Sequence, residues 1–157
     1  MFAKILYAHD FSPESEAAFE YVKKLREAGT KEVYILHVFN EKRIDLAWEL
    51  RSEIEDKPIM KERKEILNGL IKKAEDRLQG MKNELIDLGI ETKVILMTGV
   101  PSQNIIKAAD DLDVSLIVMG ARGEGAFKEI LVGSTTMRVV RSSTRPVLVV
   151  KPKNNMK

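Results

Sequence analysis

Five short apolar segments recur along this chain of 157 residues, and each is rich in β-branched residues. Most are nearly continuous apolar runs and not alternations of apolar and polar positions, which is typical of strands buried on both faces. The pattern therefore predicts five strands of a parallel sheet that is covered on both sides. They are expected at residues 3–8, 32–39, 92–97, 114–120 and 146–151.

Segments with helical spacing lie between these runs. In the first, at 12–29, Ser12 is placed to cap the helix, Pro13 occupies the first helical position, and Gly29 follows the end. Its apolar positions are Ala17, Ala18, Tyr21, Val22, Leu25 and Ala28. Three more helices are expected at 60–88, at 102–112 with Ser102 as the cap, and at 134–143. The apolar stripe of the longest one consists of Leu67, Leu70, Ile71, Ala74, Leu78, Met81, Leu85 and Leu88.

The alternation of strands and helices predicts an α/β fold with right-handed crossovers, which is a single-domain, open, parallel five-stranded sheet of the Rossmann-like kind. We expect one domain over residues 1–152 and a polar tail at 153–157. The stretch 40–58 is the least clear part of the chain. Its apolar residues fit one face of an extra short helix, although many charges interrupt it; they are Ile44, Ala47, Trp48, Leu50 and Ile54.

Composition excludes several kinds of function. The chain has no cysteine and therefore no disulfide, thiolate metal site or cysteine nucleophile. A formal net charge of +2, without a basic run interleaved with aromatic residues, argues against a nucleic-acid partner. No apolar stretch approaches the roughly 18 residues of a membrane span, and the N-terminus lacks the apolar core of a signal peptide. We expect a cytoplasmic protein with no membrane partner.

A glycine-rich segment follows the fourth expected strand. Residues 119–133 contain four of the nine glycines of the chain, and three hydroxyl residues come directly after them. The segment does not fit the P-loop pattern, and it fails the dinucleotide fingerprint because position 128 is Lys. Gly120 and Gly123 leave the end of the strand without side-chain bulk, which makes room for a base or a ribose. Gly133 and Ser134 begin the last helix, where unpaired N–H groups favour an anion.

The spacing Gly120-x-x-Gly123, nine residues, then Gly133-Ser134 resembles the ATP-binding motif of the universal stress protein family. The resemblance extends over nearly the whole chain, from "KILYAHDFSPESEAAFEYV" at the start, through "LHV" at 36–38 and "VSLIVMGARG", to "STRPVLVVK" near the end. It implies the sheet order 3-2-1-4-5, which sets the ends of the first and fourth strands side by side. It also implies a homodimer that forms through the C-terminal strand at 146–151.

The resemblance carries binding roles to particular residues. Asp10 resembles the acidic residue beside the ribose and the metal-phosphate region, and Val38 resembles the residue that packs on adenine. Met119 and Gly120 would line the base and the ribose. Ala8 replaces the proline that the family often has, and Arg122 occupies a variable position that reaches either phosphate or solvent. The residues that would hold the triphosphate are Gly123, Gly133, Ser134, Thr135 and Thr136. Mg²⁺ would be carried by the phosphates, because no cluster of protein ligands has usable spacing.

Three functions remain open from the sequence. The first is a regulatory module that binds ATP and responds through the loop at 121–132 or the dimer surface. The second is a slow ATP hydrolase or nucleotidyl transferase with Asp10 as base or metal contact and Arg122 or Lys128 as the cation. The third is an interaction module that binds no nucleotide, which the retained glycines disfavour. ADP, AMP and a cyclic nucleotide satisfy the same backbone groups and hydroxyls as ATP.

Three polar residues near the expected crevice, Asp10 and the two histidines, have a structural interpretation as well. Asp10 is placed to cap the helix that begins with "SPES", and this role competes with ligand binding. The two histidines form no serine-histidine-acid arrangement, so we expect them to be structural. His37 lies within an apolar strand, and we expect it to bond a backbone group.

Overall fold

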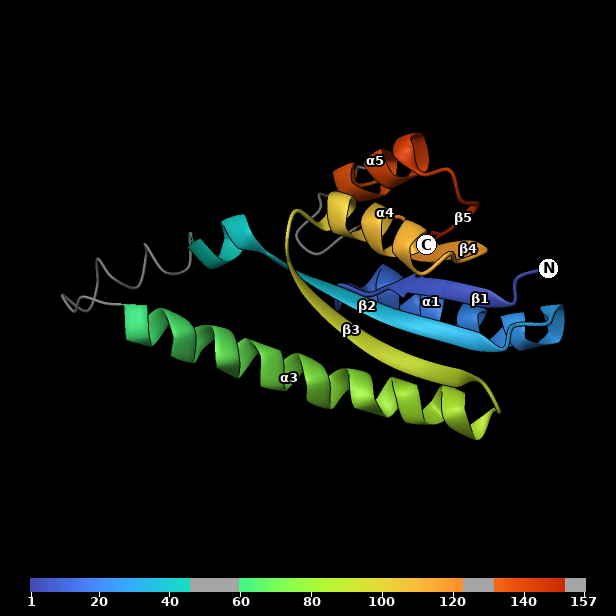
Figure 1. The fold of residues 1–157 in the computed structure, drawn as a ribbon, viewed down its shortest axis with the longest axis horizontal. Helices are drawn as coiled ribbons and strands as arrows, with labels where there is room; N and C mark the ends of the chain where they lie inside the picture. Colours follow the sequence, from blue (N-terminus) through green and yellow to red (C-terminus); the bar gives the residue numbers. More distant parts are fainter. Residues whose placement is uncertain (46–59, 123–131, 152–157) are drawn as a thin grey trace, which may run out of the picture.

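The computed structural model describes residues 1–45, 60–122 and 132–151. Its five strands form one sheet in the order β3-β2-β1-β4-β5, and all four neighbouring pairs are parallel (Figure 1). The strands are β1 (Lys4–Ala8), β2 (Glu32–Asn40), β3 (Glu91–Gly99), β4 (Leu116–Gly120) and β5 (Val147–Val150). The α/β fold predicted from the apolar runs, and the strand order implied by the resemblance, are both confirmed.

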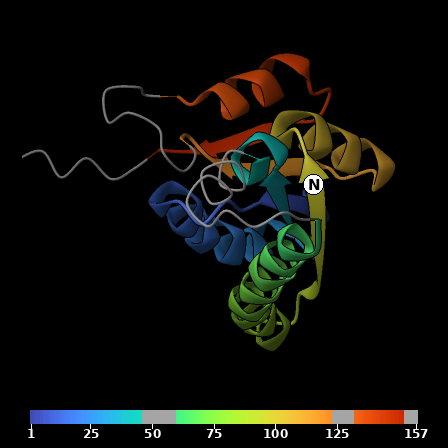
Figure 2. The same ribbon diagram turned by 90° about the vertical axis from the view of Figure 1, so that its left-hand side faces the viewer.

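Helices cover the two faces of the sheet in pairs, as Figures 1 and 2 show from two sides. α1 and α3 lie on one face, and α4 and α5 lie on the other. Their bounds are α1 (Pro13–Lys24), followed by the 3-10 turn η1 (Leu25–Ala28), then α3 (Met60–Asp87), α4 (Pro101–Asp111) and α5 (Ser134–Ser142). Residues 41–45 are also helical. The rest of the expected helical face at 40–58, with Ala47, Trp48, Leu50 and Ile54, lies outside the described residues.

The ends of α1 follow the sequence prediction, and its buried face follows it in part, since Ala18 and Val22 are buried as expected. The Ser12 hydroxyl caps the helix by accepting a hydrogen bond from the backbone N–H of Ser15 at 3.1 Å, and Gly29 ends η1 with φ 94°. Phe19 is buried, however, while Tyr21 is 50% exposed. The first turn packs on the end of β4, and this contact fixes the rotation of the helix about its axis.

The predicted cap of α4 is wrong. The helix begins at Pro101 with Val100 as its N-cap residue, and Ser102 is buried in the first turn instead. Gly99 turns the chain between β3 and this helix with φ 138°, a conformation that favours glycine. Pro101 then takes the first helical position, where its missing N–H leaves no hydrogen bond unmade.

Successive residues of the central strands pack into two separate cores, because side chains alternate between the faces of a sheet. Ile5 and Tyr7 of β1 face α1 and α3, whereas Leu6 and Ala8 face α4 and α5. The stripe of α3 is buried from Ala74 onward, through Leu78, Met81 and Leu85. Leu70 is 41% exposed, since the N-terminal part of α3 extends past the sheet (Figure 1).

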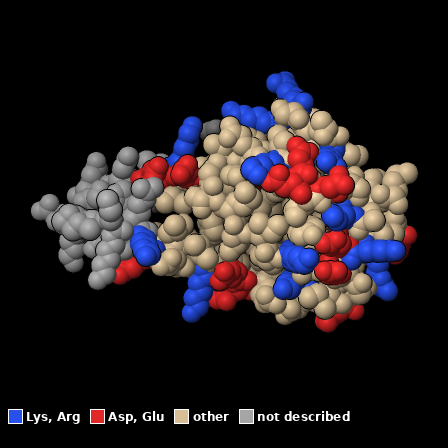
Figure 3. All heavy atoms as spheres, viewed as in Figure 1, with Lys and Arg blue, Asp and Glu red and all other residues tan. Residues whose placement is uncertain are grey.

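Acidic and basic side chains are interspersed on the face shown in Figure 3, in keeping with the small net charge of the chain. Over the described ranges, no helix is long and apolar enough to cross a membrane.

Candidate functional site

A cavity of about 470 Å³ opens at the carboxyl edge of the sheet, where β1, β2 and β4 end between α3 and α5. Most residues that the sequence singled out line it, which are Ala8, Asp10, Val38, Met119, Gly120, Arg122, Thr135 and Thr136. Gly133 and Ser134 lie beside them at the start of α5 but are not among the described lining residues. Gly123 and Lys128 lie outside the described residues. The fold thus gathers three separated segments of sequence around one hollow.

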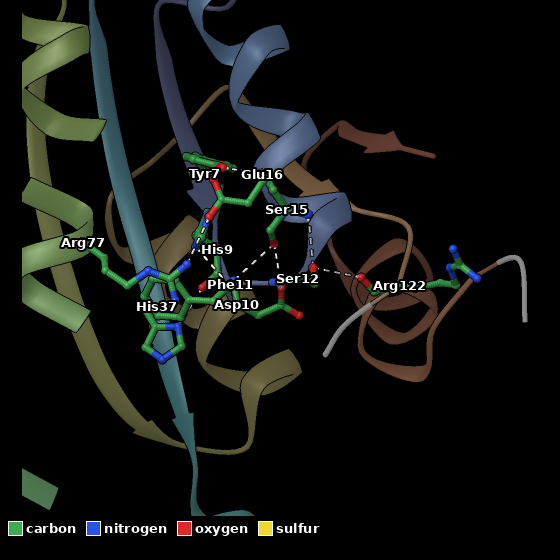
Figure 4. A network of polar contacts seen from close by, with 10 residues as sticks. All are labelled: Tyr7, His9, Asp10, Phe11, Ser12, Ser15, Glu16, His37, Arg77 and Arg122. Atoms are coloured by element: carbon green, nitrogen blue, oxygen red, sulfur yellow. Dashed lines mark hydrogen bonds and ion pairs between the residues drawn. The ribbon is translucent and has the colours of Figure 1, made fainter. Parts of the chain in front are cut away.

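The turn after β1 is held by a compact polar network (Figure 4). Asp10 Oδ1 accepts hydrogen bonds from the Ser12 backbone N–H at 3.0 Å and from Ser15 Oγ at 2.7 Å. Tyr7 Oη donates to the backbone carbonyl of the same Ser15 at 2.6 Å. Burial raises the pKa of the Tyr7 hydroxyl well above its usual range, and the charge of Glu16 adds to this effect. Asp10 therefore has the helix-start role that the sequence allowed, while it also lines the cavity.

His9 and Phe11 complete this turn. Phe11 has φ 63°, in the left-handed region, and its backbone N–H donates to His9 Nδ1 at 3.1 Å. A neutral His9 ring must then carry its proton on Nε2, which lies 3.4 Å from Glu16 Oε1 without making a hydrogen bond. Burial lowers the pKa of His9 to about 4, against a smaller opposing effect of Asp10. His9 is thus uncharged at neutral pH and has a structural part in the turn.

The prediction that His37 bonds a backbone group is confirmed. Its Nδ1 donates to the carbonyl oxygen of His9 at 2.8 Å, which links the ends of β1 and β2 below the cavity. The His37 imidazole thus connects β2 to the backbone that follows β1.

Gly120 is a glycine for a reason that the sequence did not reveal. A Cβ atom at this position would lie 2.8 Å from the carbonyl carbon and the Cβ of Glu14, and 2.9 Å from the Ser15 nitrogen. The missing side chain lets the first turn of α1 approach the end of β4. The sequence analysis explained this glycine by the room that a ligand needs, whereas the structure explains it by the close approach of α1. Gly120 still lines the cavity.

The start of α5 is fastened to the end of β4 by two hydrogen bonds. The Gly133 N–H donates to the Ala121 carbonyl at 2.6 Å, and the buried Thr136 Oγ1 donates to the Gly120 carbonyl at 2.8 Å. Gly133 is the N-cap residue, and no side chain caps this helix. The first-turn N–H groups and the hydroxyl of Thr135, a cavity-lining residue, are the donors that this end of the helix offers to an anion.

Arg122 behaves differently from either role weighed for it. Its Nη2 lies 2.7 Å from Glu14 Oε1, and both side chains are largely buried, at 15% and 10% exposed. The guanidinium thus joins the start of α1 to the chain that leaves β4. Phosphate or solvent were the two partners considered from sequence, and an intramolecular carboxylate was missed because Glu14 is 108 residues away.

Basic side chains outnumber acidic ones in the lining of the cavity. Arg43, Lys73, Arg77 and Arg122 line it, and Asp10 is the one acidic residue among the described lining residues. Sequence analysis missed the contributions of α3, because Lys73 and Arg77 sit in a run of alternating charges that looks like an ordinary solvated helix face. Across the part of the chain that the structure covers, no group of three or more His, Asp or Glu side chains is arranged to hold a metal ion.

Comparison with known proteins gives matches over essentially the whole chain. A model of the universal stress protein family matches residues 1–151. Universal stress protein MJ0577 of Methanocaldococcus jannaschii is 38% identical over 99% of this chain and 98% of its own length. Its solved structure has a TM-score of 0.85, with 98% of this chain and 99% of that chain covered. Universal stress protein YxiE of Bacillus subtilis is 33% identical over 96% of this chain and 100% of its own.

A more distant structure shares the fold alone. It is the universal stress protein from Archaeoglobus fulgidus in complex with dAMP, which is 19% identical with a TM-score of 0.60. The match covers 96% of this chain and 98% of that chain.

Proposed function

The chain belongs to the universal stress protein family, and from this premise we propose that its cavity binds ATP and that the protein acts as a nucleotide-dependent regulatory module of the stress response. The cavity residues Val38 and Met119 offer apolar contacts for the base. Asp10 lies at the turn where a ribose would sit, and its orientation is fixed by the hydrogen bonds from Ser12 and Ser15.

The observation that carries the proposal is the uncapped start of α5, which borders a cavity lined by more basic than acidic side chains. Four basic side chains and one carboxylate line the cavity. Arg122, which is paired with Glu14, lines it from the end of β4, and the uncapped first turn of α5 adds N–H donors on this side. Such a combination favours a polyanion over a neutral or cationic ligand. The Archaeoglobus fulgidus protein of this fold was solved in complex with dAMP, and this is consistent with an adenine nucleotide in the present cavity.

The residues present also fit a magnesium ion that arrives with the phosphates. Asp10 is the one carboxylate among the described lining residues, which is too few for a protein-bound Mg²⁺ and suits an ion held chiefly by phosphate oxygens and water. Bound in this way, Mg²⁺ would neutralise phosphate charge. Asp10 would orient it from the side of β1, held in place by Ser15.

The first experiment is to denature the purified protein in acid and to measure the released nucleotides by ion-exchange chromatography. Near-stoichiometric ATP supports a tight regulatory site with negligible turnover. Mostly ADP would instead favour the hydrolase alternative and make Asp10→Asn the next variant. If no nucleotide is found, a titration with ATP and Mg²⁺ decides, with Gly133→Val as the variant expected to lose affinity. A folded Gly133→Val protein that binds as tightly as the wild type would overturn the proposal.

We further propose that the protein is a homodimer that pairs through β5. This strand lies at one edge of the sheet, and Val147, Leu148 and Val149 are partly exposed while Val150 is buried. An apolar edge strand is stabilised by pairing with another strand, and pairing with a second copy gives a closed two-fold assembly. Light scattering at micromolar concentration should give twice the mass of the chain, and a monomer mass would contradict the proposal. A cytoplasmic location, and the domain limits at 152, stay predictions.

A further inference from the structure

The cavity extends beyond the nucleotide residues onto the other face of the sheet. Val33 and Ile35 pack against α1 and α3, so His37 and Phe39 lie on that same face by strand alternation. Val38 lies on the opposite face, with α4 and α5. Both sets line the one cavity. The cavity therefore wraps around the end of β2, and we call its part under α3 the α3 lobe, defined by Phe11, His37, Phe39, Leu70, Lys73 and Arg77.

Aromatic rings form the floor of the α3 lobe. The ring centroids of Phe11 and His37 are 4.7 Å apart, and those of His37 and Phe39 are also 4.7 Å apart. The Arg77 guanidinium lies over Phe11, 4.2 Å from the ring centroid, and Figure 4 shows it beside Phe11 and His37. A cation held over a ring is pre-organised to stack on a further flat group.

Basic groups of α3 project along one side of this floor. Lys73 and Arg77 are four residues apart, so they lie on the same face of the helix. Arg77 Nη2 lies 3.6 Å from Glu16 Oε1, which offsets part of its charge. Arg43 lines the cavity from the middle of the helical residues 41–45. Asp10, in the same turn as Phe11, is the one carboxylate among the described lining residues, and its Oδ1 accepts hydrogen bonds from Ser12 and Ser15.

The apolar stripe of α3 continues over the lobe. Leu70 precedes the buried Ala74 by one turn and lines the cavity together with Ile66. Leu70 is 41% exposed, because this part of α3 extends past the sheet. The lobe thus combines apolar and aromatic walls with cations at its rim, and this matches an apolar ring that carries an acidic group.

We propose that the α3 lobe binds a small aromatic anion, meaning a flat ring bearing a carboxylate, sulfonate or phosphate, while the nucleotide residues remain available for ATP. The ring would rest on His37 and Leu70, and the acidic group would meet Lys73 and Arg77. A sugar or a cation matches neither the walls nor the charge. The inference goes beyond the proposed function and does not depend on it.

The test uses 1-anilinonaphthalene-8-sulfonate, an aromatic sulfonate, as the probe with the full-length protein. We expect saturable binding of one probe per chain by fluorescence titration, with the same affinity in the presence and absence of saturating ATP and Mg²⁺. Lys73→Glu should weaken binding about three- to tenfold, as expected for reversing a partly exposed charge. The matched control is Lys72→Glu, which makes the same charge change on the neighbouring residue outside the cavity and should bind like the wild type.

A second pair of variants tests the apolar wall. Leu70→Gln should weaken binding of the probe. Ile86→Gln, at a similarly exposed apolar position near the other end of α3, should leave binding unchanged. Circular dichroism melting confirms that all four variants fold. The proposal is overturned if binding is not saturable, if ATP displaces the probe, or if the members of each pair weaken it equally. Because ATP binding is measured separately, loss of the nucleotide proposal would leave this result intact.

Discussion

Thr136 ties the last helix of the fold to the end of β4. Its buried Oγ1 donates a hydrogen bond of 2.8 Å to the carbonyl oxygen of Gly120. The same two residues line the cavity, so this hydrogen bond connects two parts of the cavity wall.

Thr136→Val should lower the free energy of unfolding by about 1–3 kcal/mol. The replacement keeps the shape of the side chain but leaves the buried Gly120 carbonyl without this donor. Thr136→Ser retains the hydroxyl and should lose less. Urea denaturation of the three proteins measures the difference, and equal stability of the Val and Ser variants would show that the hydrogen bond contributes nothing.

Gly120→Ala should destabilise the fold by about 1–3 kcal/mol, the usual cost of overpacking a filled space. The new methyl would meet the backbone of Glu14 and Ser15 at less than 3.0 Å and force α1 away from β4. Gly80→Ala is the matched control. It lies within α3 with no atom within 4 Å of the added methyl, and it should raise stability by up to about 1 kcal/mol because alanine favours helix. Similar losses in both variants would contradict the packing argument.

Arg122 is expected to have two separable effects. Arg122→Gln should lower stability by about 1–3 kcal/mol, because it leaves the largely buried Glu14 carboxylate without its partner. It should also weaken ATP binding about tenfold, by removing a cation from the lining of the cavity.

The double variant Arg122→Gln with Glu14→Gln separates these effects. Stability should return towards the wild type, since no unpaired charge remains, while ATP affinity should stay low. Chemical denaturation and calorimetric titration provide the two readouts. Recovery of affinity together with stability would mean that Arg122 acts only through the fold.

Stability should fall as the pH is lowered from 6.5 towards 4. Burial holds the pKa of His9 at about 4, below its ordinary value of 6.5. In this window the unfolded chain takes up a proton that the folded chain does not, so unfolding is favoured by about 3 kcal/mol at the lower end. The contribution of the buried, uncharged His9 to stability is therefore fully present above pH 6.5 and is lost as the pH falls towards 4.

His9→Asn provides the comparison, since its amide oxygen can accept the Phe11 N–H in place of Nδ1. Denaturant unfolding at pH 4.5 and pH 7 should show a smaller difference for the variant than for the wild type. His37, the other histidine of the chain, is present in both proteins, so its contribution cancels. The same pH dependence in both proteins would exclude His9 as its source.

The sequence by itself determined the elements and their order. Continuous apolar runs marked the five strands, and Ser12, Pro13 and Gly29 marked the limits of the first helical segment, because these signals depend on neighbouring residues only. The glycine and hydroxyl residues after β4 pointed to the carboxyl edge of the sheet before any contact was known. Strand order came from the family resemblance, since no local signal specifies it.

Only the tertiary structure decided how the elements meet. Gly120 is required by the backbone of α1, and Arg122 is paired with Glu14, yet each partner is more than 100 residues distant in the chain. The basic and aromatic side of the cavity likewise joins β2 to one face of α3. Periodicity tells which side of an element is apolar, but the rotation and approach of packed elements depend on the atoms of both partners. These contacts therefore emerge only when the whole chain is folded.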